Sequence, residues 1–66
     1  MVTYTIKNTF YRNGTKCLKI EGDCLSTDTK PTSINNVPIY NGSVMLEMNT
    51  SKVFKFDQEN EQWREL

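Results

Sequence analysis

Histidine and alanine are both absent from this 66-residue chain, and cysteine occurs only twice. Without histidine, the chain lacks the commonest general base, the commonest metal ligand and every Ser–His or Cys–His nucleophile pair. Cys17 and Cys24 cannot complete the four-ligand shell of a structural zinc site by themselves. Gly14, Gly22 and Gly42 stand singly, so no glycine-rich phosphate loop is present. We therefore predict that the protein is not an enzyme and that it uses no metal and no cofactor.

Charge of either sign is not in excess, because eight basic side chains balance eight acidic ones. This balance argues against a dedicated nucleic-acid binder, which normally carries a basic surplus. The charges are nevertheless unevenly placed: residues 1–20 contain four basic and no acidic side chains, whereas residues 57–66 contain four acidic side chains and only Arg64. These opposite poles suit head-to-tail packing of copies, neutralisation of one hairpin by the other, or two separately solvated surfaces.

Long apolar runs are also missing, since none approaches the ~18 residues of a membrane-spanning helix. The N-terminal segment alternates polar and apolar residues, unlike the continuous apolar core of a secretion signal. We therefore expect a cytosolic product without membrane contact, in which the cysteines are free thiols. An extended strand would hold Cys17 and Cys24 farther apart than the ~7 Å between Cα atoms that a disulfide allows, unless the chain folds back between them.

The pattern that is present is that of β-strands, beginning with Val2, Tyr4, Ile6 and Phe10 on one face. A two-residue Asn13-Gly14 turn would set Ile6 opposite Glu21. A three-residue turn, Arg12-Asn13-Gly14, sets Ile6 opposite Ile20 and places Gly14 at a left-handed position. We prefer the three-residue turn because it keeps apolar side chains together.

Residues 25–43 are polar and irregular, and Pro31 and Pro38 exclude a central strand there. Nineteen structureless residues would be unusual in so small a domain, so we expect part of this connector to be ordered. Its apolar residues would pack as an extended segment over one edge of the sheet: Ile34, Val37, Ile39 and Tyr40. The alternative is a flexible linker.

Residues 44–66 form the clearest strand pattern, with two alternating runs and a tryptophan. A turn at Asn49-Thr50-Ser51, with Ser51 left-handed, would pair Leu46 with Phe54 and Val44 with Phe56 on one face. A second turn over residues 58–61 would bring Trp63 opposite Phe56. The competing interpretation makes residues 58–66 a short helix.

Together these patterns predict a single small all-β domain made of an N-terminal hairpin (1–24), an extended connector (25–43) and a C-terminal three-stranded meander (44–66). The expected core consists of Tyr4, Ile6, Phe10, Leu18, Ile20, Leu46, Phe54, Phe56 and Trp63. A core this small stabilises a chain by only ~3–5 kcal/mol, so we expect a homo-oligomer.

Residues 22–66 resemble a group of small proteins encoded by phages and prophages of Gram-positive bacteria. The shared pattern is an Asn-Gly-Ser turn, a Glu-Met strand, a turn of the type Asp-Thr-Gly-Lys, an aromatic strand, then Asp-x-Glu-Asn and a tryptophan. This chain has Asn49 and Ser51 where the group usually has aspartate and glycine, and the insert CLSTD interrupts the group's GDTKPT lead-in. The pattern describes hairpins and carries no chemical motif.

The resemblance implies a virion-associated structural or accessory protein that acts by protein–protein assembly. The alternative is a small phage protein inside the host, acting as an inhibitor of a defence protein or as a sponge for a signalling nucleotide. The expected location is therefore the virion or the host cytoplasm. The expected partners are further copies of the chain with other virion proteins, or a host defence protein or nucleotide.

Two groups of residues are candidate sites. The first is a candidate site for an anion or an acidic partner, near the tip of the first hairpin: Lys7, Tyr11, Arg12, Lys16 and Lys19. The second lies opposite the main apolar file and is a candidate subunit interface: Met45, Val53 and Leu66. Ordinary solvated surface is the alternative for both. An aromatic platform for a base or sugar, built from Trp63, Tyr4, Tyr11 and Tyr40, competes with core roles for these rings.

Overall fold

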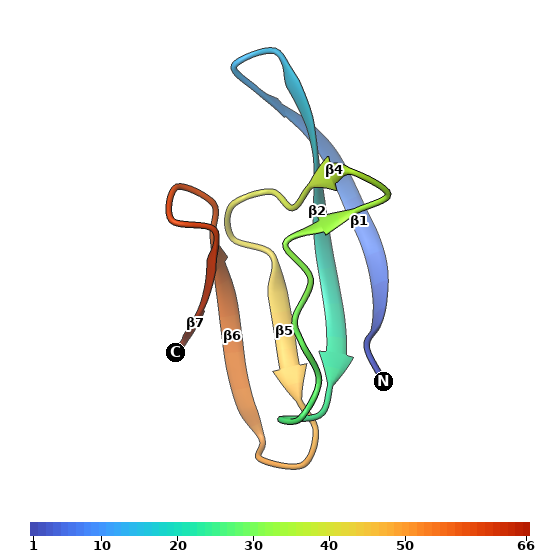
Figure 1. The fold of residues 1–66 in the computed structure, drawn as a ribbon, viewed down its shortest axis with the longest axis vertical. Helices are drawn as coiled ribbons and strands as arrows, with labels where there is room; N and C mark the ends of the chain where they lie inside the picture. Colours follow the sequence, from blue (N-terminus) through green and yellow to red (C-terminus); the bar gives the residue numbers. More distant parts are fainter.

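Strands account for all the regular structure of this protein, and no helix is present. A computed structural model describes residues 1–66. Its strands are β1 (Thr3–Arg12), β2 (Thr15–Cys24), β3 (Ser33–Ile34), β4 (Val37–Pro38), β5 (Val44–Glu47), β6 (Lys52–Asp57) and β7 (Gln62–Glu65). Five strands form one sheet in the order β1-β2-β5-β6-β7, and β3 pairs only with β4 (Figure 1). The predicted all-β fold of an N-terminal hairpin and a C-terminal meander is confirmed.

The β1–β2 hairpin turns in two residues, so the predicted three-residue turn is wrong. Arg12 lies opposite Thr15, and Asn13 and Gly14 have φ angles of 52° and 79°. These left-handed conformations suit the Asn-Gly dipeptide of a tight hairpin turn. The predicted pairing of Ile6 with Ile20 is nevertheless correct, because the register shifts at Lys7. The extra residue at this bulge brings Ile6 to the face of Ile20 but leaves Phe10, opposite Cys17, on the other face, so the prediction that Phe10 shares a face with Tyr4 and Ile6 is wrong.

The β5–β6 register differs from the predicted one by one residue. Glu47 lies opposite Lys52, so the loop spans residues 48–51, and Met45 rather than Leu46 faces Phe54. Ser51 has the predicted left-handed conformation, with a φ angle of 59°. The one-residue shift exchanges the two faces of β5, because side chains alternate along a strand.

A buried ion pair explains this register. The Lys30 ammonium donates to Glu47 Oε2 at 2.6 Å, and the Thr50 hydroxyl donates to Glu47 Oε1 at 2.7 Å. The side chains of Lys30 and Glu47 are only 13% and 8% exposed. The Lys30 ammonium also lies 4.1 Å from the centre of the Phe54 ring. Glu47 can therefore occupy an inward position because its charge is compensated, and the hydrogen bonds from Lys30 and then Thr50 lower its pKa.

The β6–β7 hairpin has the predicted arrangement. Trp63 lies opposite Phe56, with 5.0 Å between the ring centroids. The Trp63 indole N–H donates to the Pro31 carbonyl at 2.8 Å, so the ring also anchors the connector. Because β7 is a strand, the helix considered for residues 58–66 does not form.

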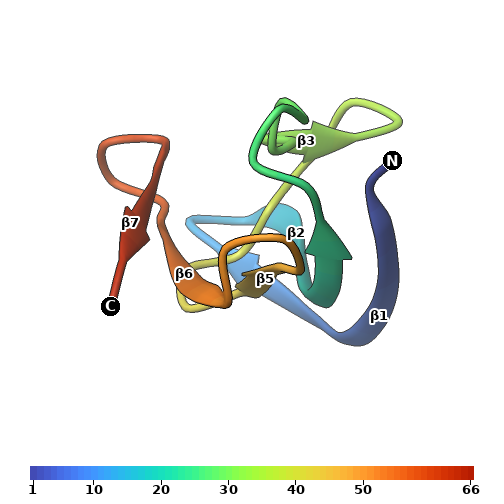
Figure 2. The same cartoon turned by 90° about the horizontal axis from the view of Figure 1, so that it is seen from below.

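The connector is ordered, and its β3–β4 hairpin covers a face of the sheet (Figure 2). It folds into the β3–β4 hairpin through Asn35 and Asn36, whose φ angles of 50° and 66° are left-handed. Ile34 and Val37 pack against the core, and Ile39 is fully buried within it. The predicted ordering of the connector is confirmed, and its predicted place is correct only for its end: β3 and β4 lie over a face, whereas Ile39 bridges to Leu18 along the side of β2.

Ser43 joins the two halves of the sheet. Its hydroxyl accepts the Ile20 N–H at 3.0 Å and donates to the Tyr40 carbonyl at 2.8 Å. Its own carbonyl accepts the Phe56 N–H at 2.9 Å. Ser43 is fully buried. In the chain it follows Ile39, which forms a parallel bridge with Leu18, and it precedes β5, which pairs in parallel with β2. One small side chain thus connects β2, the connector and β6.

The core is smaller than the predicted one and partly different. Leu18, Ile20 and Phe56 are buried as expected, and Phe54 and Trp63 pack against the core. Leu46 is half-buried on the other face of the sheet. Tyr4, Ile6 and Phe10 are instead exposed, at 44%, 47% and 37%. The buried apolar residues that the sequence analysis did not place in the core are Cys17, Cys24, Ile39 and Met45. Both cysteines are free thiols.

Replacing Ser43 by alanine should destabilise the protein markedly. The substitution leaves the buried Ile20 N–H without its acceptor, and an unsatisfied buried donor costs about 1–3 kcal/mol. Urea unfolding followed by circular dichroism measures the change. Ser33→Ala, at an exposed position, is the matched control and should change stability little. Equal stability of the two variants would show that Ser43 does not hold the halves together.

Gly22 should tolerate no side chain. A Cβ at this position would overlap the Thr3 carbonyl oxygen and lie 3.0 Å from Tyr4 Cβ and 3.2 Å from Met45 Sδ. The crowding involves backbone, which cannot rotate away, so Gly22→Ala should cost about 1–3 kcal/mol in urea unfolding. Thr5→Ala, at an exposed position of the neighbouring strand, is the control. A Gly22→Ala variant as stable as the control would contradict this packing.

Candidate functional site

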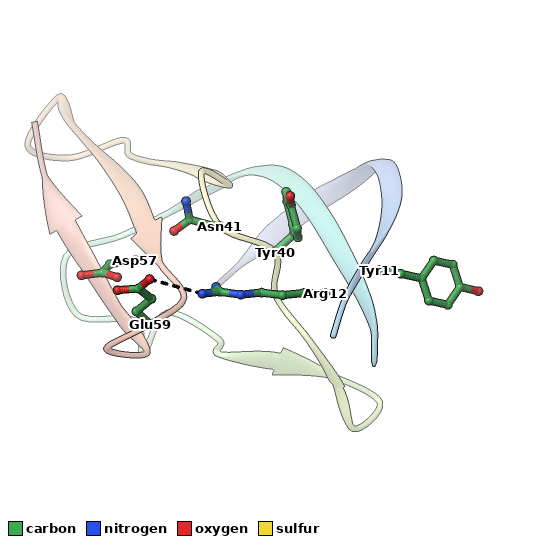
Figure 3. Close-up of a pocket in the computed structure, with 6 residues that line it drawn as sticks. All are labelled: Tyr11, Arg12, Tyr40, Asn41, Asp57 and Glu59. Carbon is green, nitrogen blue, oxygen red and sulfur yellow. Dashed lines mark hydrogen bonds and ion pairs between the residues drawn. The ribbon is translucent and has the colours of Figure 1, made fainter. Parts of the chain in front are cut away.

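A cleft of about 380 Å³ separates the tip of the β1–β2 hairpin from the β6–β7 turn (Figure 3). We call it the tip cleft; the residues that line it are Tyr11, Arg12, Tyr40, Asn41, Asp57 and Glu59. Three separate parts of the chain therefore contribute: the first hairpin, the end of the connector and the last hairpin. Of the predicted basic site, only Tyr11 and Arg12 line this cleft, and only the Arg12 side chain points into it (Figure 3).

Arg12 crosses the tip cleft toward Glu59. The guanidinium Nη2 lies 3.4 Å from Glu59 Oε1, and Figure 3 shows the Arg12 side chain extended across the opening. The Glu59 side chain is 76% exposed, so solvent screens this pair, which contributes ~0–1 kcal/mol at most. Of the four basic residues in the first twenty, only Arg12 makes an ion pair within the chain, so the last hairpin neutralises the first only in part.

The connector end is braced against the β6–β7 turn by a reciprocal pair of hydrogen bonds. The Asn41 N–H donates to Gln58 Oε1 at 3.0 Å, and the Gln58 N–H donates to Asn41 Oδ1 at 3.1 Å. The Gln58 side-chain amide then donates to Cys17 Sγ at 3.3 Å. These groups already satisfy one another, so they fix the shape of the cleft and leave few free donors for a ligand.

Asp57 organises the β6–β7 turn. Its carboxylate accepts the Asn60 side-chain amide at 2.8 Å, the Asn60 backbone N–H at 3.4 Å and Arg64 Nε at 2.9 Å. The Asn60 amide and then the Arg64 guanidinium lower the pKa of Asp57 from 3.8 to about 2. Asp57 is therefore a permanently charged structural group at neutral pH.

The aromatic side chains do not gather into one platform. Tyr40 stacks on Phe10, with 4.5 Å between ring centroids and 23° between ring planes. Trp63 packs on Phe56, and Tyr11 points away from the tip cleft (Figure 3). The core role of Trp63, one of the two alternatives drawn from the sequence, is the one that the structure has.

The predicted basic residues are divided among several places. Tyr11 lies opposite Lys16. Lys19 lies three residues farther along β2, opposite Asn8. Lys7, at the bulge, lines a separate hollow of about 300 Å³ with neighbours that include Glu21 and Asp23. The structure therefore brings together Tyr11 and Lys16, but it assembles no common anion site from all five residues.

Met45 cannot belong to a subunit interface, because it is fully buried in the core. The error follows from the one-residue shift in the β5–β6 register, which turns Met45 inward. Val53 is half-buried opposite Leu46 on the other face of the sheet. Leu66 is 75% exposed, and its N–H donates to the Val53 carbonyl at 2.9 Å. Val53 and Leu66 therefore remain neighbours on an accessible face.

A more extensive apolar surface lies on β1, where the sequence analysis placed core residues. Tyr4, Ile6 and Tyr11 are 44%, 47% and 70% exposed. They lie opposite Gly22, Ile20 and Lys16, which are alternate residues of β2 and so share one face of the sheet. We call these three residues the β1 surface. Alternation correctly grouped Tyr4 with Ile6, but it placed Phe10 with them in place of Tyr11, because it does not show the bulge at Lys7. No sequence signal showed that the connector would leave this face uncovered.

Comparison of the chain with protein-family models, with curated proteins and with solved structures finds no match. The resemblance to small phage proteins therefore stays a prediction. No group of three or more histidine, cysteine, aspartate or glutamate side chains lies together as a metal site would require. The structure contains no helix of the length and apolar character needed to span a membrane.

The pKa of Asp57 predicts how stability depends on pH. Because folding lowers this pKa from 3.8 to about 2, the ionised carboxylate stabilises the folded state fully above pH 4. That contribution is lost as the pH falls from about 4 to about 2. Urea midpoints measured across this range should therefore fall less steeply for Asp57→Asn than for the wild type. Glu61→Gln, in the same turn but outside every ion pair of the structure, is the control. Parallel wild-type and Asp57→Asn curves would contradict the assignment.

Proposed function

We propose that this protein is a phage-encoded structural or accessory protein of the virion, which acts by protein–protein assembly through the β1 surface. The observation that carries the proposal is the concentration of exposed apolar side chains on one strand. Four of the eight large exposed hydrophobic residues of the chain lie on β1: Tyr4, Ile6, Phe10 and Tyr11. Phe10 lies opposite Cys17 on the other face and stacks on Tyr40, and the remaining three form the β1 surface. A cluster of this kind is typical of a surface that another protein covers.

The total exposed surface does not account for this cluster. The chain exposes 4387 Å², and a folded monomer of 7.7 kDa is expected to expose about 4,300 Å². The molecule is therefore not too open overall. The exposed apolar side chains are instead concentrated on β1, and a binding partner would bury them.

The position of β1 also suits assembly. It is ten residues long and lies at the edge of the five-stranded sheet, where its outer side has no neighbouring strand. Figure 1 shows the β1–β2 hairpin extending well beyond the end of the remaining sheet. Strands of a partner commonly add to such an edge, with main-chain hydrogen bonds for affinity and side chains for specificity.

The alternative role inside the host has weaker support. A nucleotide sponge needs a ring that stacks on the base beside cations that bind the phosphates, and Tyr11 with Lys16 is the one such pair among the predicted residues. Tyr40, the other tyrosine near the hairpin tip, already stacks on Phe10. A nucleotide retained by the purified protein, detected by native mass spectrometry, would favour this alternative.

Incorporation into particles tests the proposal. We expect the wild-type protein in purified particles of the phage that encodes it. Ile6→Lys should reduce its amount at least about tenfold, because a buried apolar contact becomes an unpaired charge. Met48→Lys is the matched control, since Met48 is also exposed, at 59%, but lies outside β1. Circular dichroism confirms that both variants fold. Absence of the wild-type protein from particles, or equal incorporation of the folded variants, would overturn the proposal.

A further inference from the structure

The two free edges of the sheet differ in charge. β1 forms one edge and β7 the other. Residues 1–20, which include β1, carry four basic and no acidic side chains, whereas residues 57–66, which include β7, carry four acidic side chains and Arg64. On the edge strands themselves, β1 carries Lys7 and Arg12 and no acidic side chain, whereas β7 carries Glu65 beside Arg64 and follows a turn that contains Glu59 and Glu61.

Several of these charges have no partner within the chain. The five ion pairs of the structure leave out Lys7 on β1, Lys16 and Lys19 on the neighbouring β2, and Glu61 in the turn before β7. Glu65 meets Lys52 only at 3.7 Å, with both side chains about half exposed. The unpaired charges are therefore available to a neighbouring molecule.

The strand directions are also compatible. β1 is antiparallel to β2, β2 is parallel to β5, and β6 and β7 each reverse the direction once more. Consequently β7 runs opposite to β1. A second copy placed beside the first in the same orientation would bring its β7 next to β1 as an antiparallel neighbour, the more stable kind of pairing. The connector would stay on the same face in both copies.

Symmetric pairing of like edges is less favourable. A β1–β1 contact would bring two basic strands together without any acidic side chain, and like charges on facing strands are destabilising. The Lys7 bulge also interrupts the regular edge, and bulges and edge lysines are common means of preventing such pairing.

We propose that copies of this chain associate head to tail, with β7 of one copy adding to β1 of the next. The inference rests on the proposed assembly function and names a second copy of the chain as the partner of the β1 edge. Because this contact joins two different surfaces, it produces a ring if the rotation between copies closes and a filament if it does not.

Two charge-reversal variants test the proposal. Lys7→Glu/Lys16→Glu gives the β1–β2 hairpin a net negative charge, and Glu61→Lys/Glu65→Lys gives β7 and the turn before it a net positive charge. Each variant alone should dissociate, with an apparent Kd at least about tenfold above that of the wild type, because like charges then face each other at the contact. An equimolar mixture should recover the wild-type assembly, since every contact in an alternating arrangement is again between opposite charges.

Native mass spectrometry and light scattering over a range of concentrations measure these states, with circular dichroism as the check on folding. Lys55→Glu, on the inner strand β6, is the control and should assemble like the wild type. A monomeric wild-type protein would overturn head-to-tail association, yet leave incorporation into particles through another virion protein intact. An assembly that Glu61→Lys/Glu65→Lys does not weaken, or variants that fail to complement each other, would also overturn it.

Discussion

The buried hydroxyl of Ser43 is the contact on which the architecture depends. The connector pairs with β2 at Ile39, opposite Leu18, and β5 pairs with β2 from Val44 onward. Between these two pairings no strand lies beside β2, so the Ile20 N–H has no backbone partner there. The Ser43 hydroxyl replaces that partner at 3.0 Å, and its carbonyl simultaneously fixes β6. The two hairpin units thereby become one sheet. Only in a single sheet do β1 and β7 become opposite edges, so the proposed assembly depends on the same residue.

The sequence predicted the fold class and the cross-strand contacts that rest on apolar side chains. Ile6 meets Ile20 and Phe56 meets Trp63, because alternation places these residues on one face. The β5–β6 register could not be predicted in this way. Glu47 occupies an inward position that apolar periodicity assigns to a hydrophobic residue, and its charge is balanced by Lys30, which lies 17 residues earlier in the chain. Periodicity describes one strand at a time and cannot detect such a partner.

Alternation also could not predict which apolar side chains of β1 would be exposed. Alternation correctly grouped Tyr4 and Ile6 on one face, but a shared face is buried only where a second layer covers it. That layer is the connector, whose Ile34, Val37 and Ile39 pack on the core formed largely by β2, β5 and β6. β1 lies at the edge and has a neighbouring strand on one side only. The sequence therefore identified these apolar residues without indicating that they would form a surface.

The bulge at Lys7 limits the length of the strand that can pair continuously with the β1 edge. It divides the strand into two regular stretches, in which residues 3–6 and residues 8–12 pair with β2 in different registers. β7 is itself only four residues long, from Gln62 to Glu65. A strand of this length can pair with residues 3–6 without crossing the bulge, whereas a longer strand would meet an interrupted ladder. An edge that would otherwise accept many strands therefore favours a short one.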